Sequence, residues 1–243
     1  MHSVDLKIDS RRPGHGFTLL EMLVVIVIMS ILMTAGAIGL GGMGGKGVAS
    51  GVASAESLFD EARAIAVGQR INTRVMIAKE LTNTPADNLR RVVIVSEELN
   101  PDGTRRVNAD GTPVLDKWIL SSRGTVLADQ VYFSQVYSKK DHKSGGNPIP
   151  EMSLPASAKA TYAGTYFYYE FNAEGICTTP GASLVIGMGA RSVSVPTDPP
   201  KVTSVAKRDF GGFVVWRNGR TSVFRSPEQI NKEIKSIVSG AKF

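Results

Sequence analysis

Few side chains in this sequence have the types and spacing that chemistry requires. The three histidines lie far apart, at His2, His15 and His142. The single cysteine, Cys177, has no histidine or aspartate pattern around it that would mark a nucleophile. No spacing of histidine, cysteine or carboxylate suggests a metal site, and no aspartate-rich turn has the alternating oxygen ligands of a calcium loop. The sequence therefore predicts a chain without catalytic residues, metal or cofactor, and disfavours an enzyme.

One carboxylate occupies a position that needs a chemical explanation. Glu21 is the only charged residue in the apolar run of residues 17–40. As a helix, these 24 residues would extend roughly 36 Å, which is enough to cross the hydrocarbon core of a bilayer. An uncompensated carboxylate there would cost about 2.5 to 3.5 kcal/mol. Glu21 therefore needs a partner: it reaches back to the interface near Arg12, or it meets a positive charge from another molecule in the membrane plane.

Basic residues before the apolar run set its orientation. Lys7, Arg11 and Arg12 precede the run, so the positive-inside rule puts residues 1–16 in the cytoplasm and the C-terminal body on the far side. A secretory signal peptide has an apolar region of only about 7 to 15 residues. The sequence therefore predicts a single-pass membrane helix over residues 17–40.

The stretch GFTLLEMLVVIVIMSIL, residues 16–32, carries a family resemblance. With Gly16 before Phe17 and Glu21 as the fifth residue counted from Phe17, it resembles the type III signal of type IV pilins and type II secretion pseudopilins. The resemblance implies that a prepilin peptidase removes residues 1–16 as a cytoplasmic leader by cutting between Gly16 and Phe17. It also implies methylation of the new Phe17 amine, and an inner-membrane helix that later forms the filament core.

The same resemblance offers a partner for the carboxylate. In assembling filaments of this family the glutamate is thought to pair with the N-terminal amine of the neighbouring subunit, which here is Phe17. Two charges that are each costly in lipid neutralise one another only when the subunits stack in one axial register. The resemblance therefore implies that Glu21 is a subunit-assembly residue, paired with another copy.

A glycine-rich stretch follows at residues 41–47. Gly39, Gly41 and Gly44 have the spacing of a dinucleotide-binding fingerprint, but that motif needs a strand before it, and here a predicted membrane helix precedes it. Glycine costs about 1 kcal/mol per residue in a helix relative to alanine. The stretch therefore predicts a flexible or melted joint.

Beyond the joint, hydrophobic spacing predicts an α+β globule. Apolar residues at helical spacing from Val48 to Ala66 predict an amphipathic helix over 48–70 that packs on a sheet, so the long N-terminal helix has a membrane-spanning half and an amphipathic half. Asn218-Gly219 predicts a hairpin, and thus an antiparallel sheet, in a domain of residues 71–225. β-branched and aromatic runs predict strands at 73–78, 90–98, 165–171, 183–189, 212–218 and 220–225.

Two further segments are predicted from local signals. Residues 139–157, rich in turn formers and charge, are expected to be exposed and mobile. Ser226 as N-cap, Pro227 at the first helical position and Gln229 completing a capping box predict a short C-terminal helix within 226–243. Its apolar face is expected to consist of Ile230, Ile234, Ile237 and Val238.

The C-terminal fifth of the chain carries the excess positive charge. Residues 191–243 hold ten Lys/Arg against four Asp/Glu. Five of these cations cluster around the predicted hairpin: Lys207, Arg208, Arg217, Arg220 and Arg225. Such a cluster is either a solvated basic face or a contact for an anionic partner, and the hairpin could present it to DNA phosphates.

Three later stretches extend the resemblance beyond the N-terminus. Residues 58–77, 168–187 and 214–224 are similar to the C-terminal domain of H-type minor pseudopilins and FimT-like minor pilins. The loops and short strands predicted for 99–160, and the C-terminal helix, depart from that pattern. Because some FimT-like pilins are thought to bind DNA during uptake, the resemblance also implies DNA as a partner for the basic cluster.

These observations lead to one main hypothesis and two alternatives. The main hypothesis is a structural subunit, pseudopilin or minor pilin, of a type IV-pilus-like or type II secretion filament. Its expected partners are a prepilin peptidase, other pilin or pseudopilin subunits, an inner-membrane assembly platform and the lipid bilayer. Its globule is expected in the periplasm, or in a periplasmic or extracellular filament. The alternatives are a DNA-binding minor pilin for DNA uptake, and a periplasmic domain that is merely tethered by one span.

Overall fold

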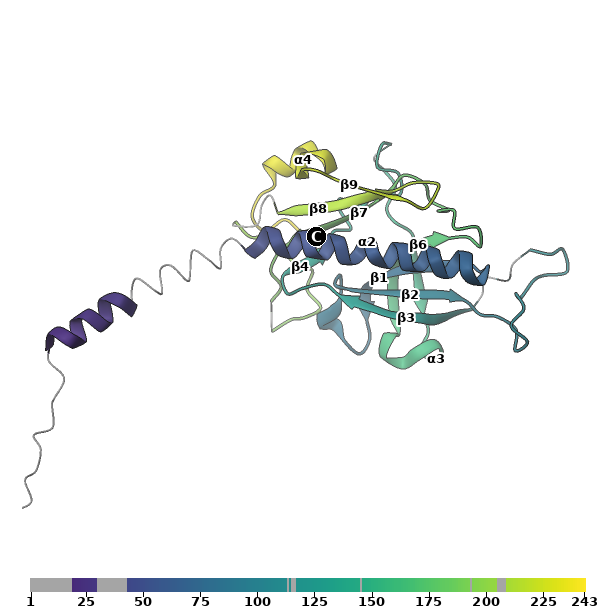
Figure 1. Ribbon diagram of the computed structural model, residues 1–243, viewed down its shortest axis with the longest axis horizontal. Helices are drawn as coiled ribbons and strands as arrows, with labels where there is room; N and C mark the ends of the chain where they lie inside the picture. Colours follow the sequence, from purple (N-terminus) through teal and green to yellow (C-terminus); the bar gives the residue numbers. More distant parts are fainter. Residues whose placement is uncertain are drawn as a thin grey trace, which may run out of the picture. The chain divides into compact units, whose positions relative to one another are not determined.

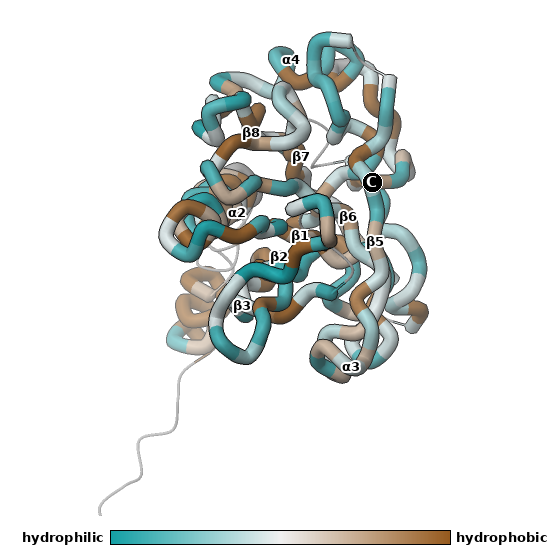
Figure 2. Tube along the Cα trace, turned by 90° about the vertical axis from the view of Figure 1, so that its right-hand side faces the viewer, coloured by the Kyte–Doolittle hydropathy of each residue, from teal (hydrophilic) through white to brown (hydrophobic). Residues whose placement is uncertain are grey.

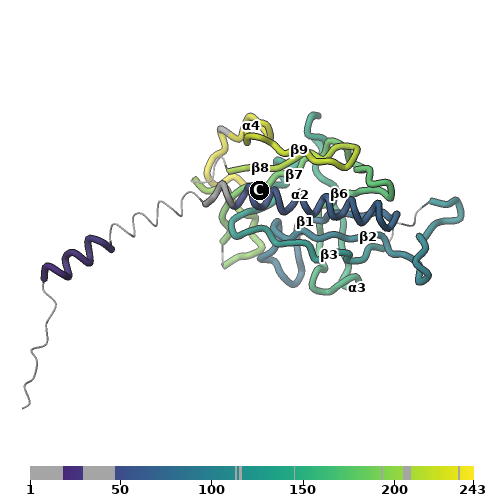
Figure 3. The backbone as a smooth tube through the Cα atoms, viewed as in Figure 1, coloured from purple at the N-terminus to yellow at the C-terminus, as the bar shows by residue number. Residues whose placement is uncertain are grey.

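The computed structural model describes residues 19–29, 43–112, 114, 117–144, 146–192, 194–204 and 209–243. The chain divides into two units, Met1–Met43 and Gly44–Phe243, and each is treated by itself. Figure 3 traces the backbone through the described elements of both.

In the first unit, residues 19–29 form a helix with every side chain exposed to solvent. Ten large apolar side chains lie on it, and their exposed fractions run from 45% at Val24 to 92% at Leu19. The predicted span of residues 17–40 extends past the described residues at both ends. Within the ranges that the structure describes, no helix is both long enough and apolar enough to cross a membrane.

The second unit is organised by α2 (Met43–Gln69). Its buried face follows the predicted helical spacing, with Val48, Val52, Phe59 and Ala66 in the core. The helix ends where Arg70 adopts a left-handed φ of 57°. This end matches the sequence prediction within one residue.

The start of α2 corrects the predicted glycine joint. Gly44, Gly45 and Gly47 lie within the helix, so a melted joint is wrong for residues 43–47, while residues 41 and 42 lie outside the described residues. A Cβ atom at Gly47 would lie 3.4 Å from Cγ2 of Val131, and one at Gly51 would lie 3.3 Å from its Cγ1. Glycine thus lets the helix pack closely on its neighbours, and this packing offsets the low helix propensity of glycine.

Two antiparallel sheets make up the rest of the globule, whereas the sequence predicted one. The first has five strands in the order β3-β2-β1-β6-β5, and the second has four in the order β4-β7-β8-β9. The first sheet contains β1 (Thr73–Leu81), β2 (Arg91–Glu97), β3 (Trp118–Val126), β5 (Glu151–Leu154) and β6 (Gly164–Phe171). The second contains β4 (Val131–Phe133), β7 (Ala182–Met188), β8 (Phe210–Val215) and β9 (Thr221–Val223).

The core forms where α2 meets both sheets (Figure 1). The ring of Phe59 on α2 lies 5.1 Å from Tyr169 of β6 in the first sheet and 5.0 Å from Phe213 of β8 in the second, measured between centroids. Figure 2 shows hydrophobic residues along α2, β2 and β8. The predicted α+β fold, a helix packed on antiparallel strands, is confirmed.

The first sheet is buried on its other face as well. There a second apolar cluster includes Met76, Val95, Trp118 and Tyr166. The short helices α3 (Ala156–Lys159) and η2 (Ala160–Tyr162) contribute to this cluster, whereas a third short helix, η1 (Pro85–Asp87), links β1 to β2. Both sides of the five-stranded sheet therefore carry packed apolar residues.

Part of the segment predicted to be exposed and mobile is instead ordered. Within residues 139–157, Ile149 and Leu154 are buried. Residues 151–154 form β5, which pairs with β6. The turn-rich composition of this segment gives no local sign of this edge strand, which forms by pairing with the next strand of the chain.

The predicted C-terminal helix is broken into two short pieces, α4 (Pro227–Ile230) and η3 (Lys232–Ser236). Asn231 interrupts it in an extended conformation, and its side chain accepts a hydrogen bond from the Glu233 N–H, so it caps the second piece. The oxygen of Gln229 accepts from the backbone of Arg225, not of Ser226 as in a capping box. Three predicted apolar residues, Ile230, Ile234 and Ile237, are buried, but Val238 is 67% exposed.

Candidate functional site

The predicted assembly residues fall at the N-terminus, where the structure describes one of three. Gly16 and Phe17 lie outside the described residues. Glu21 lies on the helix of residues 19–29, among exposed apolar side chains. The helix therefore presents one carboxylate within an apolar surface.

The predicted basic cluster lies on the hairpin of β8 and β9. Lys207 and Arg208 are outside the described residues, whereas Arg217, Arg220 and Arg225 are described and exposed. Among the described residues, no carboxylate forms an ion pair with these three arginines. Arg217 and Arg220 lie at the turn of the hairpin, whereas Arg225 lies beyond the other end of β9.

The turn of this hairpin is one residue longer than the two-residue turn that Asn-Gly typically forms. Trp216 donates its N–H to the carbonyl of Arg220 at 2.8 Å, and Gly219 donates to the carbonyl of Trp216 at 2.9 Å. Within residues 216–220 only Gly219 has a positive φ, +74°, so the loop is a three-residue turn closed by a glycine bulge. A Cβ atom at Gly219 would lie 2.6 Å from Cδ of Arg63 on α2. The absence of a side chain at Gly219 therefore allows Arg63 to lie close to the turn.

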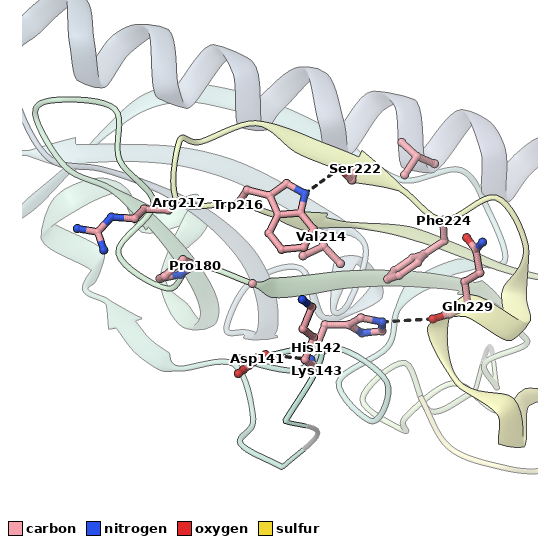
Figure 4. A pocket seen from close by; sticks show the side chains of 12 residues that line it. Asp141, His142, Lys143, Pro180, Val214, Trp216, Arg217, Ser222, Phe224 and Gln229 are labelled. Atoms are coloured by element: carbon pink, nitrogen blue, oxygen red, sulfur yellow. Dashed lines mark hydrogen bonds between the residues drawn. The ribbon is translucent and has the colours of Figure 1, made fainter.

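A groove of 480 Å³ lies beside the hairpin, and we call it the hairpin groove (Figure 4). Its apolar lining includes Val214, Trp216 and Phe224. The indole N–H of Trp216 donates to the hydroxyl of Ser222 at 2.7 Å, which holds the half-exposed ring in place. The groove can therefore receive an apolar group without rearrangement of this ring.

Charged groups line the opposite wall of the hairpin groove, on the loop of residues 141–143. The ammonium of Lys143 lies 5.9 Å from the Trp216 ring centroid. The Lys143 N–H donates to Asp141 at 2.9 Å, and this bond is the main cause that lowers the pKa of the Asp141 carboxyl. His142 packs on Phe224, with ring centroids 4.8 Å apart, and its Nε2 lies 3.2 Å from the Gln229 carbonyl oxygen.

These features suit binding, and the described residues hold no set of groups arranged for a metal. No cluster of three or more histidine, cysteine, aspartate or glutamate side chains that could hold an ion occurs in the described ranges. Cys177 is buried, and burial raises the pKa of its thiol. A buried thiol that stays protonated suits packing in the core rather than nucleophilic attack.

Sequence reasoning identified the hairpin but missed the groove beside it. His142, Lys143 and Phe224 come from segments that are about 80 residues apart along the chain, and their contacts depend on the fold. The one local signal was Trp216, a large aromatic residue placed directly before a turn.

Comparison with known proteins identifies the N-terminal segment. Residues 11–37 match the model of the prokaryotic N-terminal methylation motif. The N-terminal segment of the chain therefore carries a prepilin-type motif. As in other proteins with a prepilin-type motif, this implies processing by a prepilin peptidase, assembly with other pilin subunits and anchoring in the inner membrane.

The chain is also similar to solved structures, at a low level. Two crystal forms of the type IV minor pilin FimU of Pseudomonas aeruginosa align with it. One is 15% identical with a TM-score of 0.32 over 74% of this chain and 94% of that chain. The other is 14% identical with a TM-score of 0.29 over 72% and 90%. No curated protein matches.

Proposed function

We propose that the chain is a structural subunit, a minor pilin or a pseudopilin, of a type IV-pilus-like or type II secretion filament. The observation that carries the proposal is the methylation motif at residues 11–37 together with the exposed apolar helix at 19–29, which bears Glu21. Each apolar side chain on that helix gains about 1.5 to 3 kcal/mol on leaving water. Lipid before assembly, and neighbouring subunits after it, are the two environments that supply this burial.

The proposed route begins at the membrane. A prepilin peptidase cuts between Gly16 and Phe17 on the cytoplasmic face, and the new amine of Phe17 is methylated. The apolar helix stays in the inner membrane with the globule in the periplasm. The assembly platform then moves the subunit into the filament.

Glu21 has a specific role in this proposal. Its carboxylate pairs with the Phe17 amine of the neighbouring subunit. Because a buried charge without its partner is far less favourable than the pair, a subunit at the wrong axial height is penalised twice. The pair therefore selects the register of the filament.

Processing is tested by the intact mass and N-terminal sequence of the chain extracted from native membranes. We expect a chain that begins at methylated Phe17. Gly16→Val should leave the chain starting at Met1, because the peptidase no longer accepts the junction, whereas Gly14→Val serves as the matched control and should be cut normally. A wild-type chain that starts at Met1 in cells with an active peptidase contradicts the proposal.

Assembly is tested separately with Glu21→Leu, with Met22→Leu as the neighbouring control. We expect both variants to be cut and to remain in the membrane, but only Met22→Leu to appear in sheared filament fractions. Recovery of Glu21→Leu in filaments at the wild-type level would contradict the role proposed for Glu21. Absence of the wild-type chain from filaments would instead favour a periplasmic domain tethered by one span. Whether the fraction contains pili or secretion pseudopili decides between the two filament types.

DNA binding is a second candidate, favoured by the exposed arginines of the hairpin. If Arg217, Arg220 and Arg225 contact phosphates, retention of the full chain on DNA should fall steeply with salt. Loss of one arginine, as in Arg220→Ala, should reduce the salt slope by about 1. Arg123→Ala, at an exposed position of β3, is the matched control and should leave the salt slope unchanged. Indifference of the chain to DNA at low salt removes this candidate.

A further inference from the structure

The strand β9 forms one edge of the four-stranded sheet and pairs with β8 on its other side. Two backbone bonds fix the ladder: Trp216 N–H donates to the Arg220 carbonyl at 2.8 Å, and Phe224 N–H donates to the Gly212 carbonyl at 2.9 Å. Hydrogen-bonded pairs alternate with non-bonded pairs along an antiparallel ladder. Val214 and Ser222 lie midway between these two backbone bonds, so they form the hydrogen-bonded pair between them.

This alternation determines which backbone groups of β9 point away from the sheet. Ser222 directs its N–H and C=O to β8, so Thr221 and Val223 direct theirs outward. Within the part of the chain that the structure describes, no group bonds these outward N–H and C=O groups. The edge therefore offers two donors and two acceptors to an incoming strand.

Apolar hollows flank this edge on both faces. The hairpin groove lies on the face of Ser222 and Phe224. A second groove of 410 Å³, which we call the helix groove, lies between β9 and α2 and is lined by Val52, Ala53 and Val223. Val223 is 48% exposed. Since successive side chains of a strand point to opposite faces, an added strand would place neighbouring side chains in the two grooves in turn.

Cations stand at both ends of the edge. Arg220 directly precedes β9 and Arg225 follows it by two positions, and both are exposed. Lys143 and Arg217 also line the hairpin groove. A strand with acidic side chains at its two ends complements this arrangement.

The carboxylates of the two grooves leave this complementarity in place. Asp141 in the hairpin groove already accepts the backbone N–H of Lys143, and Glu56 in the helix groove accepts the hydroxyl of Thr221. Asp209 lines the helix groove beside the start of β8. Glu56 lies at the Arg220 end of β9, but its carboxylate is already engaged by the Thr221 hydroxyl.

We propose that β9 accepts an extended acidic segment of a partner protein as an added strand of the sheet. Backbone bonds to Thr221 and Val223 give the affinity, and apolar side chains at alternate positions in the two grooves give the selectivity. The proposal goes beyond the filament function and does not rest on it, because the edge belongs to the globule. The processing and assembly tests described above can fail while the strand-addition test succeeds. The strand-addition test can equally fail while those two succeed.

The first experiment measures binding of a defined probe to the full chain in detergent micelles by fluorescence anisotropy. The probe is a labelled seven-residue peptide of alternating valine and threonine with aspartate at both ends. We expect it to bind at least tenfold more tightly than the same peptide with lysine at both ends. Equal binding of the two peptides, or no binding of the acidic one, overturns the proposal.

Amide hydrogen exchange then locates the contact at single residues. Added peptide should slow exchange at Thr221 and Val223 by tenfold or more, because their N–H groups gain acceptors. Exchange at Ser222 should change little, because that N–H already bonds to β8. Protection of all three, or of none, is incompatible with strand addition at this edge.

Variants at Val223 complete the test. Val223→Pro removes one outward N–H donor without removing a hydrogen bond to β8, and should weaken binding of the acidic peptide at least tenfold. Val223→Asp changes only an exposed side chain and should weaken binding of the acidic peptide, because the two negative charges repel. This variant keeps the test decisive if the proline variant folds poorly. Val238→Asp, at another exposed valine, is the matched control and should bind as the wild type does. Unchanged binding by Val223→Asp overturns the proposal.

A DNA probe separates a different class of partner. If a labelled twelve-nucleotide DNA strand binds the chain, displaces the peptide and loses affinity in Arg220→Ala but not in Val223→Asp, the hairpin is a nucleic-acid surface and strand addition is rejected. Failure of the DNA strand to displace the peptide supports the edge as a protein-binding site.

Discussion

Two helices of this chain have opposite surroundings. In α2 one face is buried, and Phe59 and Ala62 are fully enclosed by the two sheets. On the helix of residues 19–29 all the side chains are exposed, up to 92% at Leu19. The difference shows that α2 is stabilised by packing within the second unit, whereas the apolar side chains of residues 19–29 remain exposed, as is typical of a surface that binds another molecule or lipid.

The sharpest test of this comparison removes one large apolar side chain from each helix. Phe59→Ala should lower the free energy of unfolding by about 3 to 5 kcal/mol, because it leaves a cavity among three aromatic rings. Leu23→Ala should change it by less than about 0.5 kcal/mol. Denaturant unfolding of the full chain in detergent, followed by tryptophan fluorescence, measures both. A comparable loss in Leu23→Ala would break the comparison.

A smaller effect is expected where a side chain is added to α2. Gly51→Leu should cost about 1 to 3 kcal/mol, because a Cβ atom there already lies 3.3 Å from Val131 and 3.5 Å from Leu127. Gly68→Leu is the matched control, because a Cβ atom at Gly68 has no neighbour within 4 Å. The same unfolding assay distinguishes them. Equal stability of the two variants would mean that close packing does not explain the glycines of α2.

The smallest effect concerns the bond that ties α2 to the last hairpin. The hydroxyl of Thr221 donates to Oε1 of Glu56, so Thr221→Val should cost about 1 kcal/mol. Glu56→Gln retains an acceptor oxygen and should cost less. If the order of these two variants is reversed, the carboxylate contributes to stability through something other than this bond.

The sequence predicts the longer helices and strands, but it does not predict elements whose structure depends on contacts with other parts of the chain. The β-branched runs and Asn218-Gly219 located β1, β2 and the terminal hairpin, because alternation and turn chemistry are local signals. β4 and β5 have only three and four residues, too few to show a clear alternation, and β4 also pairs with a strand far along the chain. For residues 43–47, helix propensity alone predicts a melted joint, because it does not include the packing of α2 on its neighbours. The break at Asn231 depends on a side-chain cap that competes with the helix.

The candidate sites divide in the same way. Glu21 was recognisable because a charge in an apolar run is conspicuous, and Arg217, Arg220 and Arg225 because they flank one predicted hairpin. The hairpin groove was not predictable, because Lys143 and Phe224 meet only in the folded chain. The outward backbone groups of Thr221 and Val223 depend on the observed ladder register, which the turn sequence alone does not specify.

The enclosure of Cys177 makes the chain convenient for site-directed labelling. Its thiol is 1% exposed and, with a raised pKa, forms little of the thiolate that reacts with maleimides at neutral pH. A second cysteine introduced on β9 or on the exposed face of α2 would therefore be the sole reactive thiol. Cross-linking and spin-label distances between neighbouring molecules could then be measured without replacing the native residue.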